Sequence, residues 1–181
     1  MKKYLSILLI LSFSSVAQAF NKEDIIHNLK NINNITFDFE QNINGKIERG
    51  NCILKYPKKI FCKYNLSNQK ILVSNGKSLV IKTKNSYYFY KLKNTPLNFI
   101  LDKNFLINKI NNSQKRIVEN KFVNYSFIEN DNEINIFFDK KNNLIGWQII
   151  DIYQNLNITF LSSIIKNQIL DNNIFVLPRQ N

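Results

Sequence analysis

Apolar and polar side chains alternate through residues 35–64, which read ITFDFEQNINGKIERGNCILKYPKKIFCKY. Apolar residues at every second position are typical of a β-strand with one buried face. The pair Asn44-Gly45 is a strong signal for a two-residue hairpin turn. A second turn is expected at residues 56–59, where a proline separates two apolar runs. The stretch therefore predicts three consecutive antiparallel strands.

The two turns predict a register for these strands. The first turn predicts the pairs Ile43 with Lys46, Phe39 with Gly50, Phe37 with Cys52, and Ile35 with Leu54. The second turn predicts the pairs Leu54 with Ile60, Cys52 with Cys62, and Gly50 with Tyr64. Both turns place the apolar members on the same face of the sheet. Agreement between two independent turns and one hydrophobic face is the strongest structural signal in the sequence.

Residues 1–19 have the parts of a secretory signal peptide. Two lysines provide the basic start, residues 5–16 are almost wholly apolar, and Ala17-Gln18-Ala19 fits the small-x-small pattern that signal peptidase recognises. The apolar run is about a dozen residues, shorter than the roughly 20 that span a bilayer. We therefore predict export, with cleavage directly after this pattern.

The chain has two cysteines, Cys52 and Cys62, and the predicted register places them opposite each other. Directly opposed residues on neighbouring strands are close enough for a disulfide, and an exported protein meets an oxidising environment. We expect a disulfide between them. Two reduced, buried cysteines that pack as small hydrophobic residues are the alternative.

The mature domain, residues 20–181, is strongly basic. The full chain has 25 Lys and Arg against 13 Asp and Glu, and loss of Lys2 and Lys3 with the signal leaves 23 against 13, a net charge of +10. Such an excess is compatible with nucleic acid, anionic lipid head groups or acidic partner surfaces. Export argues against nucleic acid, so we expect transient contact with membranes.

The rest of the chain predicts one opening helix, many strands and a short helical segment. Asn21 is typical of a helix cap, and apolar residues from Ile25 to Ile32 recur at helical spacing. Thr95 and Pro96 predict a capped helix start, with one or two short helices up to about residue 110. Further strands are predicted at residues 71–74, 78–82, 87–92, 116–119, 123–129, 133–139, 144–151 and 156–161, with a last strand at 175–178.

No combination of residues predicts catalysis. His27 is the single histidine, and its spacing places no nucleophile or second metal ligand beside it. The few acidic residues show no pairing of a buried acid with a base, and four glycines leave little room for a phosphate-binding loop. We predict no catalytic residues, no cofactor site and no metal site.

Large apolar side chains are numerous for a sheet with few helices to cover it. Those predicted to share its inner face are Phe37, Phe39, Leu54, Ile60, Tyr64, Phe89, Phe99, Phe105, Phe127, Phe138 and Trp147. They can form an ordinary solid core. Alternatively, a strongly curved sheet closed by short helices can leave a cavity for an apolar ligand, as small barrels do. Periodicity does not distinguish these two interpretations.

The order of motifs resembles the periplasmic outer-membrane lipoprotein carrier family, LolA, over essentially the whole mature chain. The resemblance rests on the opening helix, residues 37–41 (FDFEQ), 54–61 (LKYPKKIF), 71–79 (ILVSNGKSL), Thr95-Pro96-Leu97, and a closing Phe175 and Pro178. It implies a mainly β fold, a curved antiparallel incomplete β-barrel closed by a lid of short helices. It also implies an acyl-chain cavity lined by the apolar residues above, with lid contacts at Tyr56, Pro96, Leu97 and Ile100.

Two details qualify the resemblance. The family commonly has Lys-Arg-Pro where this chain has Lys55-Tyr56-Pro57, and the family's arginine bonds to the lid. Tyr56 can donate one hydrogen bond but carries no charge. The related receptor family is lipid-anchored through an N-terminal cysteine, and none lies near the predicted cleavage point. Its absence favours the carrier.

The resemblance implies a monomeric periplasmic chaperone that takes acylated lipoproteins from an inner-membrane transporter to an outer-membrane receptor. Such a carrier needs no covalent step, because it only offers apolar surface to acyl chains. The alternative is a periplasmic lipid sensor or free-lipid transporter that uses the same cavity. An enzyme is a third class, which no residue pattern supports.

Overall fold

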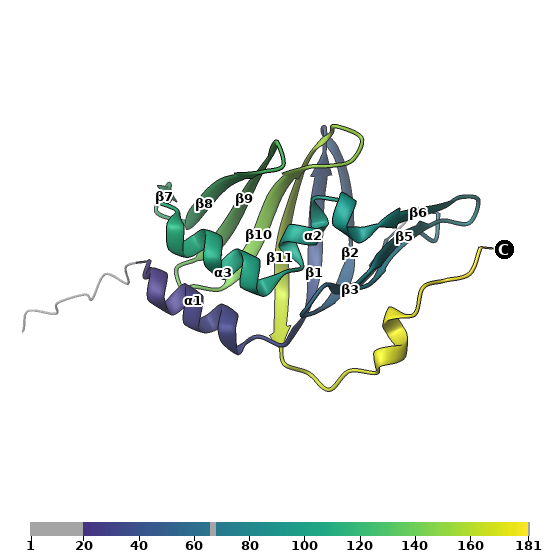
Figure 1. Cartoon of the computed structure of the whole chain (residues 1–181), viewed down its shortest axis with the longest axis horizontal. Helices are drawn as coiled ribbons and strands as arrows, with labels where there is room; N and C mark the ends of the chain where they lie inside the picture. Colours follow the sequence, from purple (N-terminus) through teal and green to yellow (C-terminus); the bar gives the residue numbers. More distant parts are fainter. Residues whose placement is uncertain (1–19, 66–67, 181) are drawn as a thin grey trace, which may run out of the picture.

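The computed structural model describes residues 20–65 and 68–180 (Figure 1). Over these residues the chain forms an open, eleven-stranded antiparallel sheet with short helices on one face. The predicted signal peptide, residues 1–19, lies outside the described residues. The predicted fold class, a mainly β incomplete barrel with a helical lid, is confirmed.

Strands make up most of the described chain. In chain order they are β1 (Asn34–Ile43), β2 (Lys46–Lys55), β3 (Lys59–Tyr64), β4 (Ile71–Asn75), β5 (Ser78–Lys82), β6 (Tyr87–Lys91), β7 (Lys115–Val118), β8 (Phe122–Glu129), β9 (Asn132–Asp139), β10 (Leu144–Ile150) and β11 (Leu156–Lys166). Their order across the sheet is β6-β5-β4-β3-β2-β1-β11-β10-β9-β8-β7. Because β6 and β7 are both edge strands, the barrel does not close.

The register predicted for the first three strands is confirmed. β1 pairs with β2 so that Ile43 lies opposite Lys46 and Phe37 opposite Cys52. β2 pairs with β3 so that Cys52 also lies opposite Cys62, with Gly50 opposite Tyr64. The burial of these strands alternates as the apolar pattern predicts, because one face is turned toward the helices.

The pairing of β1 with β11 was not predicted. These strands lie at opposite ends of the chain, yet they pair from Ile35 with Lys166 to Ile43 with Asn157. The pairing shifts between Thr36 and Asp38, so the ladder is irregular at that point. The sheet is therefore two meanders, β1–β6 and β7–β11, joined along this central seam.

Three short helices cover the inner face of the sheet (Figure 1). The first, α1 (Lys22–Asn31), begins as predicted, because the side chain of Asn21 accepts a hydrogen bond from the backbone N–H of Glu23 at 3.0 Å. After β6 come a 3₁₀ turn, η1 (Leu92–Asn94), and the lid helices α2 (Leu97–Ile100) and α3 (Lys103–Asn112).

Two local predictions were wrong. Thr95 does not cap α2 with its side chain: its hydroxyl donates to the carbonyl of Leu92 at 2.8 Å and closes η1. The segment predicted as a last strand forms a second 3₁₀ turn, η2 (Asn172–Phe175), followed by irregular chain. Phe175 is buried there, and η2 packs on β3 and β4. Residues 175–178 are a short apolar run, as in a strand, but they form no backbone ladder with the strands of the sheet.

Solid core fills one half of the space beneath the helices. α1 and α3 pack on each other and over the half of the sheet that contains β8–β10. The fully buried residues of this core are Ile25 and Leu29 of α1, Leu106 and Ile110 of α3, Tyr125 of β8 and Phe138 of β9. The other half, over β2–β5, is covered by short segments, η1, α2 and the turn after β10, and a cavity remains beneath them.

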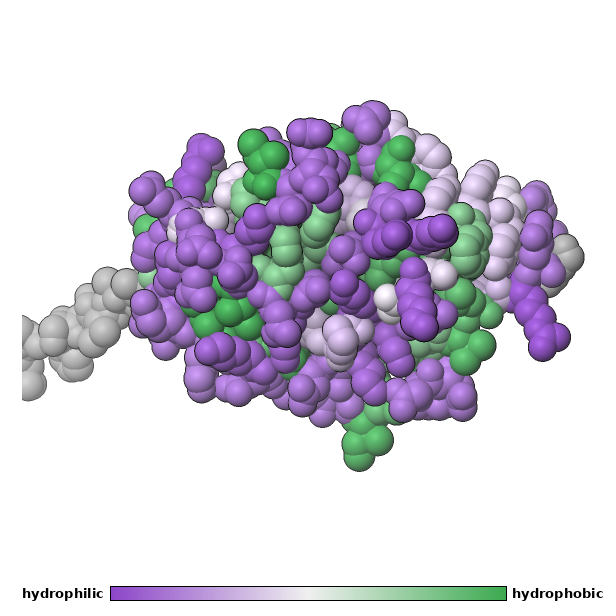
Figure 2. All heavy atoms as spheres, in the orientation of Figure 1, coloured by the Kyte–Doolittle hydropathy of each residue, from purple (hydrophilic) through white to green (hydrophobic). Residues whose placement is uncertain are grey.

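Polar side chains cover most of the face that carries the helices, and apolar ones show in separate patches between them (Figure 2). The apolar inner face of the sheet is therefore largely hidden from water by the helices.

Candidate functional site

An apolar cavity of about 330 Å³ lies between the β1–β5 half of the sheet, β10 and the start of the lid. Its apolar wall includes Phe37, Phe39, Ile60, Leu72, Leu79 and Trp147. Pro96 and Leu97 of the lid segment close it on the helix side. A volume near 300 Å³ is at the lower end of the range for pockets that hold small organic ligands, roughly 300–1,000 Å³.

Aromatic rings form much of this wall. The ring of Phe37 meets Trp147 edge-on, with centroids 6.2 Å apart, and Phe39 meets Tyr64 in the same manner at 5.0 Å. Gly50 lies between Phe39 and Tyr64 in the register. A Cβ there would lie 2.1 Å from the backbone oxygen of Lys63 and 2.8 Å from the Phe39 ring. Only glycine permits this close approach.

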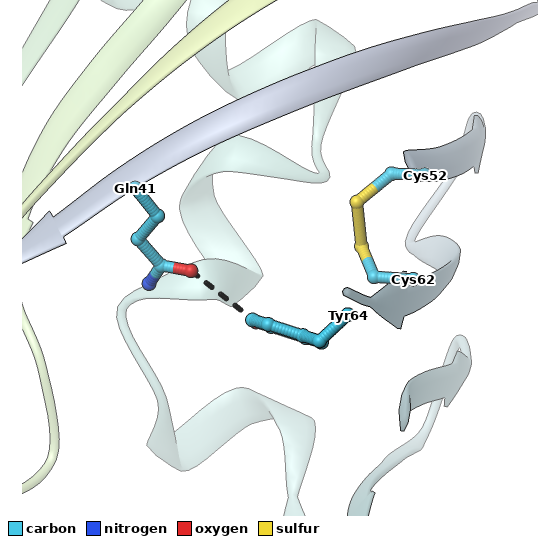
Figure 3. The surroundings of a disulfide bond; sticks show 4 residues. All are labelled: Gln41, Cys52, Cys62 and Tyr64. Carbon is cyan, nitrogen blue, oxygen red and sulfur yellow. Dashed lines mark hydrogen bonds between the residues drawn. A yellow bond between two sulfur atoms is a disulfide. The ribbon is translucent and has the colours of Figure 1, made fainter. Parts of the chain in front are cut away.

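The disulfide also belongs to the cavity wall. Cys52 and Cys62 are bonded, as predicted, and both line the cavity (Figure 3). Beside them the hydroxyl of Tyr64 donates to the side-chain oxygen of Gln41 at 3.3 Å. The bond therefore covalently joins β2 and β3 where both strands face the ligand space.

A charged cluster lies at one end of the cavity. The carboxylate of Glu48 is almost fully buried and bonds to the ammonium groups of Lys70 at 2.5 Å and Lys46 at 3.3 Å. Burial alone would raise the pKa of Glu48, but the hydrogen bonds and positive charges of the two lysines outweigh it and lower that pKa. The Lys70 ammonium also lies 4.1 Å from the centre of the Tyr64 ring.

Two lysines make charged contacts at the junction of the lid with the sheet. The backbone N–H of Lys58 donates to the carbonyl of Leu101 at 2.8 Å, and its ammonium pairs with Asp102 at 3.3 Å. The ammonium of Lys103 donates to the carbonyl of Ile32 at 2.8 Å and lies 5.8 Å from the Tyr56 ring centre. Charged contact with the lid therefore remains, although residue 56 is neutral.

Tyr56 itself is buried beside this junction. Its hydroxyl has no hydrogen-bond partner among the described residues. Burial, together with the negative charge of Asp102, raises the pKa of Tyr56. The side chain therefore contributes packing to the lid rather than the hydrogen bond that its hydroxyl could have supplied.

Two tyrosines link edge strand β6 to the turn between β10 and β11 at the cavity rim. The hydroxyl groups of Tyr90, on edge strand β6, and Tyr153, in the turn after β10, are hydrogen bonded to each other. Burial and this hydrogen bond raise the pKa of Tyr90 to about 12. Tyr153 also lines the cavity, so this contact forms part of its rim.

A second cavity, which we call the polar cavity, lies next to the first. It has a volume of about 410 Å³ and is lined mainly by polar residues of three loops. Thr95, Pro96, Asp151 and Ile152 line both cavities, so these residues form a shared wall.

The structure brings together only some of the residues predicted to share the inner face. Phe37, Phe39, Ile60, Tyr64 and Trp147 line the apolar cavity, together with Pro96 and Leu97 of the lid. Leu54, Phe138 and Ile100 are fully buried in the core instead. Phe89 is 55% exposed on β6, so it does not belong to this face.

Three of the predicted phenylalanines form a chain of rings at the lid. Phe99 lies 5.0 Å from Phe105, and Phe105 lies 5.7 Å from Phe127. They pack against the core between the lid and β8, and Phe99 also lines the polar cavity. His27 is exposed on α1, where its ring contacts the side chain of Asn31.

Several lining residues were not predicted from the sequence. Leu72 and Leu79 lie in strands whose alternation was recognised, so the same pattern could have identified them. Gln41 and Glu48 are polar, but the predicted register places them opposite each other on the same face as Phe39 and Gly50, so it could have identified both. Lys70 lies outside the predicted strands and gave no such signal.

The family model described as outer membrane lipoprotein carrier protein LolA matches residues 20–178. The chain belongs to the LolA family. The match covers the whole described sheet and lid, so the apolar cavity lies within a LolA fold. This fold is consistent with binding of lipids or lipoproteins. No match was found among curated proteins.

Solved structures resemble this LolA chain at low identity. A LolA superfamily protein from Nitrosomonas europaea is 9% identical with a TM-score of 0.40, over 88% of this chain and 99% of that one. The Mycobacterium tuberculosis lipoprotein LppX is 8% identical with a TM-score of 0.46, over 83% and 96%. A DUF1329 family protein from Desulfovibrio piger is 7% identical with a TM-score of 0.43, over 86% and 95%.

The described residues lack a membrane-spanning helix and a metal-binding cluster. None of the helices in residues 20–65 and 68–180 is long and apolar enough to cross a membrane. The same residues hold no group of three His, Cys, Asp or Glu side chains placed to bind a metal ion.

Proposed function

We propose that this protein is a periplasmic carrier that holds the acyl chains of lipoproteins as they pass from the inner to the outer membrane. The observation that carries the proposal is the apolar cavity beneath the lid, in a chain of the LolA family. Its wall of aromatic and aliphatic side chains is chemically suited to hydrocarbon.

The physical problem for such a carrier is the cost of exposing acyl chains to water. At about 0.8 kcal/mol per methylene group, a lipoprotein with several chains is effectively fixed in its membrane. A carrier must replace the bilayer with apolar surface of its own. The cavity provides that surface without any covalent step, so the proposal requires no catalytic group.

The lid is the part expected to move. Residues 95–97 close the cavity, but α2 is a single turn attached mainly through its neighbours η1 and α3. A multiply acylated ligand needs more room than about 330 Å³, so α2 and α3 would shift as it enters.

An inner-membrane transporter would load this monomeric carrier, and an outer-membrane receptor would unload it. The basic surface would favour brief contact with anionic membranes or acidic partner faces, because opposite charges speed encounter.

Acyl-chain binding can be tested with two matched variants. Ile81 lines the cavity and is half-buried, whereas Ile128 is 72% exposed on β8 outside both cavities. Ile81→Glu should abolish transfer of a triacylated lipoprotein from detergent to the carrier, because a carboxylate would lie beside the acyl chains. Ile128→Glu should transfer it normally. Loss of transfer in both variants, or in neither, would contradict the proposed site.

The nature of the bound molecule separates the carrier from its alternative. We expect acylated polypeptide to co-purify with the protein from its own periplasm, as detected by mass spectrometry. Recovery of free phospholipid or glycolipid alone would favour the lipid sensor or free-lipid transporter.

A further inference from the structure

The polar cavity is surrounded by amide side chains from three separate loops. Asn94 comes from η1, Asn130 from the β8–β9 turn, Asn132 from the start of β9, and Gln154 from the β10–β11 turn. Asn94, Asn130 and Gln154 are exposed, and within residues 20–65 and 68–180 their side chains make no hydrogen bond to protein. Three solvent-accessible amides therefore line one space.

The charges around this space do not favour an anionic ligand. Lys93 is the one cation in the lining. The carboxylate of Asp151 is occupied by its own turn, where it accepts from the backbone N–H groups of Tyr153 at 2.8 Å and Asn155 at 2.9 Å. Amides both donate and accept hydrogen bonds, as the peptide bond does. The lining therefore suits a neutral polypeptide better than a phosphate, which proteins usually hold with several cations or N–H groups.

The polar cavity lies directly beside the space proposed for the acyl chains. Pro96 and Ile152 face both cavities, so a ligand with hydrocarbon in the apolar cavity needs only to cross this wall to reach the amides. A molecule that fills both spaces is therefore apolar at one end and rich in hydrogen-bonding groups at the other.

We propose that the polar cavity binds the first residues of polypeptide that follow the acylated cysteine of the ligand. The inference rests on the proposed function, since it presumes acyl chains in the apolar cavity. It makes the site selective for acylated polypeptide over free lipid, because a phospholipid offers no peptide groups to the amides.

Two synthetic probes test the inference. One is tripalmitoyl-glycerylcysteine followed by a short uncharged peptide, and the other is the same lipidated cysteine ending in a simple amide. The protein should bind the first about tenfold more tightly, the ratio expected for one or two net hydrogen bonds. Displacement of a fluorescent fatty acid measures both affinities.

A double variant isolates the amides. Asn94→Ala with Gln154→Gly removes two of them, and glycine suits the positive φ of 62° at residue 154. The matched control is Asn85→Ala with Asn120→Gly, which changes an exposed asparagine and one with φ of 52°, both outside the two cavities.

We expect the double variant to lose the tenfold preference for the lipopeptide and the control variant to keep it. The two variants should bind the lipidated cysteine amide with equal affinity. If the wild-type protein shows no preference, or the double variant retains it, the polar cavity is not the peptide site. Those results would not contradict the proposed carrier function. Failure of both probes to displace the fatty acid would overturn the proposed function together with this inference.

Discussion

Tyr56 is a neutral residue at a junction whose charged contacts come from two lysines. Lys58 pairs with Asp102, and the ammonium of Lys103 donates to the carbonyl of Ile32. Tyr56 then has only its ring to contribute, and its buried hydroxyl has no partner among the described residues. Burying an unbonded hydroxyl destabilises the folded state.

We therefore predict that Tyr56→Phe raises the free energy of unfolding by about 1 kcal/mol, since it removes that unbonded group. Urea denaturation measures the change. Tyr87→Phe is the matched control, because the Tyr87 hydroxyl donates to the carbonyl of Pro178 at 3.1 Å and its loss should destabilise by a similar amount. A decrease in stability for Tyr56→Phe equal to that of the control would show that its hydroxyl is bonded after all.

Glu48 makes the stability of the cavity wall dependent on pH. The pKa of this carboxyl is lowered in the folded protein, so its contribution is present above the unfolded-state pKa near 4.5 and is lost as pH falls below it. Glu48→Gln should lower the free energy of unfolding by about 1–3 kcal/mol at neutral pH, because it leaves Lys70 without its buried partner.

Urea midpoints measured from pH 7 to pH 3 check this prediction. The difference in free energy of unfolding between the wild type and Glu48→Gln should become smaller as the pH falls through the lowered pKa of Glu48. Glu40→Gln should have an effect below about 1 kcal/mol, because Glu40 pairs with Arg49 on the exposed surface. A difference for Glu48→Gln that is constant across the pH range would rule out the ion pair as its source.

At the scale of secondary structure, the β2–β3 hairpin carries the covalent link of the cavity wall. The disulfide spans a sequence separation of 10 residues. Closing so short a loop removes little entropy from the unfolded chain, so replacing both cysteines with alanine should lower the free energy of unfolding by at most about 3 kcal/mol.

Reducing agent provides the internal control for this prediction. The urea midpoint of the wild type should fall in its presence toward that of Cys52→Ala with Cys62→Ala, whose own midpoint should not change. If reduction leaves the wild-type midpoint unaltered, the two sulfurs are not joined in solution.

The hairpins were predictable because their signals are local. Asn44-Gly45 and the turn at residues 56–59 fix which residues lie opposite each other, and alternation then assigns the faces. The seam between β1 and β11 has no such signal, since it joins residues more than a hundred positions apart. The same limit applies to Phe175, because the apolar run that contains it fits a strand until the packing of η2 is known.

The site was only partly predictable for a related reason. Phe37 and Phe127 have the same apolar alternation in sequence, yet Phe37 lines the cavity and Phe127 packs in the filled half. Which half stays open depends on where α1 and α3 pack, and this depends on the whole tertiary structure. Phe89 lies opposite Val80, whereas its neighbour Tyr90 lies opposite the cavity-lining Leu79, so Phe89 is on the other face of the sheet, where it is exposed.

At the scale of the whole molecule, the two halves have different tasks. α1 and α3 close the β8–β10 half with a solid core, whereas the β1–β5 half keeps a cavity under short segments. The seam of β1 with β11 joins the two halves into one continuous sheet.

Loading should therefore be visible as a change confined to the lid. The backbone N–H groups of Phe99 and Leu101 donate to the carbonyls of Pro96 and Leu97, and that of Lys58 donates to the carbonyl of Leu101. We predict that a triacylated ligand, too large for about 330 Å³, displaces α2 and speeds hydrogen exchange at these amides. Amides of the β1–β2 ladder should exchange as slowly as before.

A short single-chain fatty acid is the control, because it fits the existing cavity and should leave exchange in α2 unchanged or slower. Mass spectrometry of peptides covering residues 95–112 and 34–55 separates lid from sheet. If the triacylated ligand slowed hydrogen exchange equally in the lid and in the sheet, it would bind without displacing α2. The cavity would then have to enlarge by flexing of the sheet itself.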